Sequence, residues 1–143
     1  MKHILNNIKF RLPALDQNVS ICTAIVSNFS SLLNPTIEEL GDIRISVGEA
    51  FKNAVQHAYK DLEEGKEGFV YIQVRLYDLR EVTVEISDNG CGIEDVDSVL
   101  DRKSSFDFPG MGFMIMKNFM DTVIVKSKVG KGTTILMRKA LRK

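Results

Sequence analysis

Hydrophobic residues recur with two different periods along this chain. A period of about 3.6 residues predicts amphipathic helices over residues 19–33 and from about residue 36 to Lys60. Alternation with a period of two, weakest in the first segment, predicts strands over residues 4–12, 69–77, 81–88, 122–127 and 133–139. Residues 113–120 form a further helical segment, whose methionines we interpret as core residues.

The order of these segments predicts the fold class. We expect the first strand at an edge of a sheet and the other four strands in two hairpins. Residues 94–107 are polar and predict a short helix that passes into a mobile loop. The chain is therefore predicted to be one α+β domain, a two-layer sandwich with helices on one face of a mixed, mostly antiparallel sheet.

Local signals mark where the two long helices begin and where the second is weakened. Residues 16–20 offer side-chain caps to the first helix, and residues 34–39 offer a cap, a proline and acids that suit the helix dipole. Gly41 and Gly48 lie inside the second helix, where each costs up to about 1 kcal/mol. A close approach by another backbone or by a ligand would explain these glycines.

The second helix carries two stripes of side chains on nearly opposite sides. At about 100° per residue, the apolar stripe comprises Leu40, Ile43, Val47, Phe51, Ala54 and Ala58. The polar stripe comprises Ser46, Glu49, Asn53 and His57. A carboxylate, an amide and an imidazole in successive turns are suited to hold a hard cation and to move a proton. On an arbitrary amphipathic helix, however, such a stripe is more often solvated surface.

Three glycine-containing segments follow this helix. Asp88 ends a strand and is followed by Gly90 and Gly92, residues 110–112 lead into a helix, and residues 132–133 open the last strand. Their spacing excludes the dinucleotide fingerprint, the P-loop and the calcium loop. An ionised Asp only accepts hydrogen bonds, so it suits the exocyclic amine of adenine, and glycines let backbone N–H groups approach phosphates. Taken alone, an Asp-x-Gly at a strand end is more often a simple turn.

Composition narrows the choice of function. The 143 residues suffice for one core, and 44% hydrophobic with 27% charged residues is typical of a globular protein. Nineteen basic residues balance 19 acidic ones, so direct nucleic-acid binding is not favoured. No apolar run is long enough to span a membrane, and Cys22 and Cys91 form no metal-ligand spacing. We expect a cytoplasmic protein with free thiols.

Together and in this order, the polar helix and the glycine segments resemble the GHKL ATPases, the Bergerat-fold family of gyrase, heat-shock chaperone, histidine kinase and mismatch-repair type. Glu49, Asn53 and His57 resemble the N box, residues 88–92 the first glycine box, residues 110–112 the second, and residues 132–133 the closing Gly-Thr. The match covers about residues 45–139. Finer features, such as the run over residues 110–121, resemble the anti-sigma factor serine kinases, and among them the subfamily of endospore formers.

The resemblance implies a role for each of these residues. Glu49 would be the general base and Asn53 a ligand of Mg²⁺, whereas His57 would lie beside the phosphates or be a hydrogen-bonded helix histidine. Asp88 would bind adenine, supported by Thr133. The glycines and Met111 would shape the site: Gly90 and Gly92 around the base, and Gly110, Met111 and Gly112 as backbone donors to the phosphates of ATP or ADP. Residues 94–109 would form a lid.

The resemblance also implies partners. A chain of this type would bind a sigma factor, phosphorylate a STAS-type anti-anti-sigma protein on serine, and form a homodimer through residues 1–33. An alternative is a nucleotide-gated binding module without useful kinase activity, and a detached histidine-kinase domain is disfavoured because no phosphoacceptor helix pair precedes the fold.

Two positions depart from the pattern of these kinases. Phe108 replaces an expected lid arginine, with Arg102 or Lys103 as substitutes, and Thr23 replaces a partner-contacting arginine.

Overall fold

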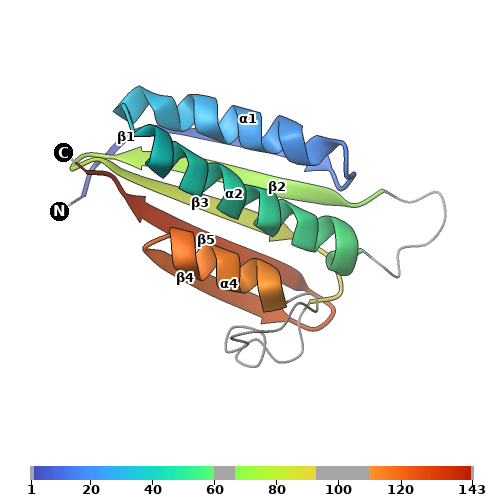
Figure 1. The fold of residues 1–143 in the computed structure, drawn as a ribbon. Helices are drawn as coiled ribbons and strands as arrows, with labels where there is room; N and C mark the ends of the chain where they lie inside the picture. Colours follow the sequence, from blue (N-terminus) through green and yellow to red (C-terminus); the bar gives the residue numbers. More distant parts are fainter. Residues whose placement is uncertain (1, 60–66, 93–109, 143) are drawn as a thin grey trace.

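The fold is a five-stranded sheet with helices on one face, as seen in a computed structural model that describes residues 2–59, 67–92 and 110–142 (Figure 1). Its elements in chain order are β1 (Ile4–Pro13), α1 (Asn18–Ser30), the 3₁₀ turn η1 (Ser31–Leu33), α2 (Ile37–Asn53), its π-helical continuation η2 (Ala54–Ala58), β2 (Phe69–Tyr77), β3 (Glu81–Asp88), α4 (Gly110–Phe119), β4 (Thr122–Lys128) and β5 (Gly132–Ala140). The predicted helix and loop at residues 94–107 lie outside the described residues.

The strands follow the order β1-β2-β3-β5-β4, and all four pairings among the described residues are antiparallel. Strand β1 lies at an edge, and both predicted hairpins are present. The pairing of β3 with β5 sets Ser87 opposite Thr134, so the last residue of β3 and the first residues of β5 meet at one end of the sheet. The prediction of an α+β sandwich with a mostly antiparallel sheet is confirmed.

The core lies between the helices and the covered face of the sheet. Its largest fully buried side chains come from both layers and are Phe51, Phe113, Ile43, Ile72, Leu76, Met116, Met137, Val26, Val47, Val70, Val74 and Val82. Full burial of one such side chain contributes about 1.5–3 kcal/mol to folding. The apolar stripe of α2 is thus the face that packs, which leaves its polar stripe directed toward α4.

The helix ends confirm one capping prediction and contradict another. Thr36 caps α2 in a capping box, in which its hydroxyl accepts from the Glu39 amide (3.1 Å) and Glu39 accepts from the Thr36 amide (2.9 Å). The predicted side-chain cap of α1 is wrong, because Asn18 in the candidate segment donates instead to the carbonyl of Pro13 (2.9 Å).

The two glycines of α2 also differ from each other. A Cβ on Gly48 would lie 3.5 Å from the Thr23 side chain, whereas one on Gly41 would meet nothing within 4 Å. Among the described residues, neither glycine therefore shows the expected close approach by another backbone, because a Cβ on Gly48 would make only an ordinary contact with side chains of α1.

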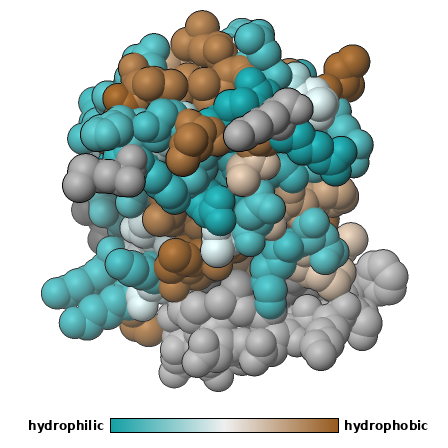
Figure 2. Space-filling view, turned by 90° about the vertical axis from the view of Figure 1, so that its left-hand side faces the viewer, coloured by the Kyte–Doolittle hydropathy of each residue, from teal (hydrophilic) through white to brown (hydrophobic). Residues whose placement is uncertain are grey.

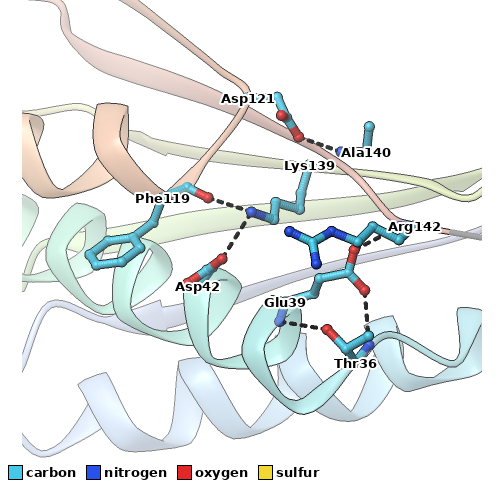
Figure 3. A network of polar contacts seen from close by, with 8 residues as sticks. All are labelled: Thr36, Glu39, Asp42, Phe119, Asp121, Lys139, Ala140 and Arg142. Atoms are coloured by element: carbon cyan, nitrogen blue, oxygen red, sulfur yellow. Dashed lines mark hydrogen bonds and ion pairs between the residues drawn. The ribbon is translucent and has the colours of Figure 1, made fainter.

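A polar network joins α2, α4 and β5 at the end of the domain away from the glycine segments (Figure 3). The ammonium group of Lys139 donates to Asp42 (3.0 Å) and to the carbonyl of Phe119 at the end of α4 (2.7 Å). Buried Glu39 also accepts from the Arg142 amide (2.7 Å). These contacts hold α2 and α4 side by side, which positions the polar stripe of α2 against the start of α4.

The surface at the end that carries both termini is mixed, with apolar patches among hydrophilic side chains (Figure 2). Exposed aliphatic residues here are Leu32 of η1, Ile37 at the start of α2 and Leu79 in the β2–β3 turn. Among the described residues, no helix is both long enough and apolar enough to cross a membrane.

Candidate functional site

The polar stripe of α2 faces α4 instead of solvent. Asn53 is 9% exposed, and the Glu49 side chain is 13% exposed. A Cβ added to Gly112 would lie 3.3 Å from Glu49 Oε2 and 3.5 Å from Asn53 Nδ2. The start of α4 therefore lies within contact distance of both side chains, and a side chain at position 112 would press most closely on the Glu49 carboxylate. The interpretation of the stripe as solvated surface does not hold for these two residues.

The amide of Asn53 is the most unusual group in the stripe. Both Oδ1 and Nδ2 are buried, and neither has a hydrogen-bond partner among the described residues. Leaving a buried polar group unpaired costs about 1–3 kcal/mol, and native proteins rarely tolerate it without a reason. An amide oxygen in this state fits a hard cation such as Mg²⁺, which prefers oxygen ligands.

Asp88 is held at the end of β3 by two backbone amides. Its Oδ1 accepts from Gly90 N (2.9 Å) and from Thr133 N (3.2 Å), whereas Oδ2 accepts no hydrogen bond from the described residues. Burial raises the pKa of this carboxyl above its ordinary value of 3.8, although the two amides act in the opposite direction. A buried carboxylate with one free oxygen is suited to accept a hydrogen bond from a ligand amine.

Thr133 supports Asp88 through its backbone amide and not through its side chain. The Thr133 hydroxyl lies 2.8 Å from Ser127 Oγ at the end of β4. Sequence reasoning did not single out Ser127, because only the register of β4 against β5, which pairs Ser127 with Thr133, brings it here.

Three glycines in this region are required by close backbone approaches. Side chains at Gly90, Gly92 and Gly132 would collide with the carbonyl oxygens of Ala58, Lys128 and Asp88, respectively. Gly92 (φ +79°) and Gly132 (φ +93°) also adopt backbone conformations that favour glycine. These glycines let the loop after β3, the end of η2 and the start of β5 close around Asp88.

The backbone amides of this loop are already used within the protein. Asn89 N donates to the Tyr59 hydroxyl (2.9 Å), Gly90 N to Asp88, and Cys91 N to the carbonyl of Ala58 (2.8 Å). The loop therefore shapes a pocket and does not offer these three amides to phosphates. Donors for phosphates have to come from elsewhere, and the first amides of a helix such as α4 have no intrahelical acceptor.

These groups meet in one cavity, which has a volume of about 50 Å³ and is partly open to solvent. It is lined by Ala50, Asn53, His57, Ala58, Ile86, Asp88, Gly92, Phe113, Thr133 and Ile135. Apolar walls with a few convergent polar groups are typical of a small-molecule site. Glu49, Gly110, Met111 and Gly112 are not among its lining residues, but Gly112 lies beside Asn53, and residues 110–112 form the first turn of α4.

The π-helical segment η2 brings two backbone groups to this cavity. Ala58 accepts from Cys91 N, and the carbonyl of His57 accepts from Cys91 Sγ (3.3 Å). Such π-helical turns are rare and occur frequently at functional sites. The hydrophobic periodicity predicts ordinary helix to Lys60 and gives no signal for the π-helical turn.

A matched pair of glycine substitutions tests the close approach at β5. Gly130→Ala places a methyl group in open space at φ +81°, so we expect only the backbone strain of about 1–2 kcal/mol. Gly132→Ala adds a collision with the Asp88 carbonyl, so we expect a larger loss of stability and weaker ligand binding. Thermal unfolding of both variants measures the difference; equal losses would contradict the described packing.

The lid over residues 94–109, with Phe108, Arg102 and Lys103, lies outside the described residues. Thr23 is described and is buried against Gly48, with its hydroxyl donating to the carbonyl of Ser20 (3.1 Å). Its side chain therefore packs between α1 and α2.

Fold and site together define a class of protein. Residues 12–139 match the family of the histidine kinase-like ATPase domain, to which the chain therefore belongs. The chain is 38% identical over 138 residues to an anti-sigma F factor of Clostridium acetobutylicum, covering 94% of this chain and 93% of the relative. It is 39% identical over 140 residues to that of Priestia megaterium, with 95% and 93% covered. Within the family, the chain is thus a member of the anti-sigma F factor group.

Solved structures agree on the fold. The RsbU and RsbW domains of a Mycobacterium tuberculosis protein match with a TM-score of 0.70 at 16% identity, over 96% of this chain and 33% of that one. A blue-light activated histidine kinase domain of Erythrobacter litoralis matches with a TM-score of 0.60 at 19% identity, over 91% and 62% of the two chains. The predicted Bergerat-type family is confirmed.

Proposed function

We propose that this protein is an ATP-dependent protein serine kinase that acts as an anti-sigma factor. It binds a sigma factor and phosphorylates a STAS-type anti-anti-sigma protein on serine. The observation that carries the proposal is the cavity that Asp88 shares with the amide of Asn53, which has no hydrogen-bond partner among the described residues, with Glu49 close to that amide. The anti-sigma F relatives support the choice of partners.

Adenine recognition rests on Asp88. Its Oδ2 is available to accept a hydrogen bond from the exocyclic amine of adenine, whereas the carbonyl of guanine would offer it no donor. Ile86 and Ile135 line the same cavity and suit the faces of a flat ring. Gly90 and Gly92 keep the loop close enough to close the pocket.

The phosphate end of the nucleotide lies toward α2 and α4 in this proposal. The amide oxygen of Asn53 holds Mg²⁺, while the backbone amides of Gly110, Met111 and Gly112 donate to phosphates and His57 lies beside them. Mg²⁺ usually takes only one or two protein ligands and completes its shell with phosphates and water.

Glu49 is the proposed general base. It accepts the proton of the serine hydroxyl as the serine oxygen bonds to the terminal phosphorus, and the bond from that phosphorus to ADP breaks. When bound, Mg²⁺ would neutralise charge on the phosphates. Glu49 is close to Asn53 and mostly shielded from water, and its only ion pair among the described residues is with Lys52 (3.6 Å).

The partner surface is proposed to lie on β1 and α1, within residues 1–33, which would also form the homodimer. Exposed apolar side chains on these elements support an interface there: Ile4 and Leu5 on β1 and Ile21 on α1.

Phosphate transfer tests the proposal directly. The chain is incubated with Mg²⁺, γ-labelled ATP and candidate anti-anti-sigma proteins, with and without sigma factor. We expect acid-stable phosphoserine on one candidate. Partner binding that depends on nucleotide, without phosphoserine, would instead establish a nucleotide-gated module. Acid-labile phosphate on histidine would overturn the serine-kinase assignment.

A further inference from the structure

Tyr59 lies outside the proposed catalytic set and does not line the cavity, but its hydroxyl bonds the backbone next to Asp88. It follows η2, and its hydroxyl donates to the carbonyl of Phe69 at the start of β2 (2.5 Å) and accepts from the amide of Asn89 (2.9 Å). Its ring lies against Gly68, where an added Cβ would come within 2.5 Å of ring atoms. One side chain thus connects the end of the long helix, β2 and the loop after β3.

The amide of Asn89 belongs to the peptide bond that follows Asp88. Because a peptide unit is planar, an acceptor that fixes this N–H also fixes the carbonyl and Cα of Asp88. The carboxylate itself is tied to Gly90 and Thr133 through Oδ1. Two backbone amides therefore hold the carboxylate through Oδ1, and the Asn89 amide, which donates to Tyr59, fixes the peptide unit from which the Asp88 side chain extends.

The hydroxyl is chemically suited to this task because a phenol can donate and accept at the same time. Phenylalanine would keep the packing against Gly68 but would leave the Phe69 carbonyl and the Asn89 amide without this partner. Burial raises the pKa of Tyr59 above its ordinary value of 10.0, so the hydroxyl remains protonated throughout the neutral range.

We propose that Tyr59 is a positioning residue for base selectivity: its hydroxyl orients Asp88 so that the free carboxylate oxygen meets the exocyclic amine of adenine. The inference rests on the proposed nucleotide site and adds a determinant of its specificity. Tyr59 acts through the backbone of residues 88–89 and does not itself contact the base.

The test compares two nucleotides that differ only in this amine, ATP and purine riboside triphosphate. For Tyr59→Phe we expect ATP affinity to fall about tenfold, because Asp88 is no longer held in place for its hydrogen bond with the adenine amine. Affinity for the analogue, which lacks this amine, should change less than about twofold. The preference for ATP therefore shrinks. Tyr77→Phe is the matched control, because the Tyr77 hydroxyl makes no hydrogen bond among the described residues, and it should keep the wild-type preference.

A purely structural role would weaken both nucleotides equally, and an unchanged preference in Tyr59→Phe would overturn the inference. In the Asp88→Asn background, Tyr59→Phe should cause no further loss of preference, because both act on one contact. As a second variant, 3-fluorotyrosine at position 59 keeps a hydroxyl that can donate and accept, and it should retain the preference. If the wild-type chain bound neither nucleotide, the proposed function itself would be overturned. If the wild-type chain bound ATP and Tyr59→Phe kept the same preference, only the inference about Tyr59 would be overturned.

Discussion

Asp88→Asn is expected to lower the affinity for ATP about 100-fold or more while the protein remains folded. The Asn side-chain oxygen can still accept from Gly90 N and Thr133 N, so the loop keeps its support. Its NH₂ group, however, takes the place of the free carboxylate oxygen and opposes the adenine amine with a second donor. Calorimetric titration with ATP measures the loss, and Asp16→Asn, at an exposed position before α1, is the matched control.

The pKa of Asp88 adds a prediction for stability without nucleotide. Because burial raises the folded-state pKa above 3.8, the folded protein binds more protons than the unfolded chain between these two pKa values. The contribution of Asp88 to stability therefore falls as the pH rises through that window and stays low at neutral pH. Asp88→Asn removes this cost, so its melting temperature at pH 7 should equal or exceed that of the wild type. A strongly destabilised variant would contradict the described environment.

Glu49→Gln is expected to abolish phosphate transfer while nucleotide binding survives. The substitution keeps the size and polarity of the side chain but removes the proton acceptor, for which a loss of about 100-fold or more is typical. ATP affinity should stay within about threefold, because Glu49 does not line the cavity that contains Asp88. Single-turnover transfer and ATP titration measure the two quantities separately.

Glu38→Gln on the first turn of the same helix controls for removal of a negative charge, since Glu38 is exposed. Unchanged turnover in Glu49→Gln would remove Glu49 as the base. A joint loss of binding and transfer would assign it to ligand binding instead.

The sequence could predict those features that depend on periodicity. The apolar stripe of α2, from Ile43 through Phe51 to Ala58, is buried as expected, because a 3.6-residue repeat can cover a core along only one side of a helix. The alternating segments form the predicted hairpins, because a two-residue repeat places apolar side chains on one face of a strand. The apolar stripe also located the polar stripe on the opposite side of α2. Asn53 of that stripe lines one cavity together with Asp88.

What the sequence could not predict depends on contacts between distant segments. The amide of Thr133 reaches Asp88 because β5 pairs with β3, and the Tyr59 hydroxyl at the end of η2 accepts from the amide of Asn89, which is 30 residues away in the sequence. Neither contact has a periodic signal. The Asn18 side chain bonds the Pro13 carbonyl and does not cap α1. Both kinds of local backbone contact are open to an asparagine, so the residue type alone does not predict which one forms.

The central claim is that an adenine nucleotide spans the cavity from Asp88 to Asn53. Equilibrium titration of the wild-type chain with ATP, by calorimetry with and without Mg²⁺ and with GTP in parallel, tests it most directly. We predict saturable binding of one ATP per chain that is tighter with Mg²⁺, and no comparable binding of GTP. Absence of saturable ATP binding in the presence of Mg²⁺ would contradict the claim.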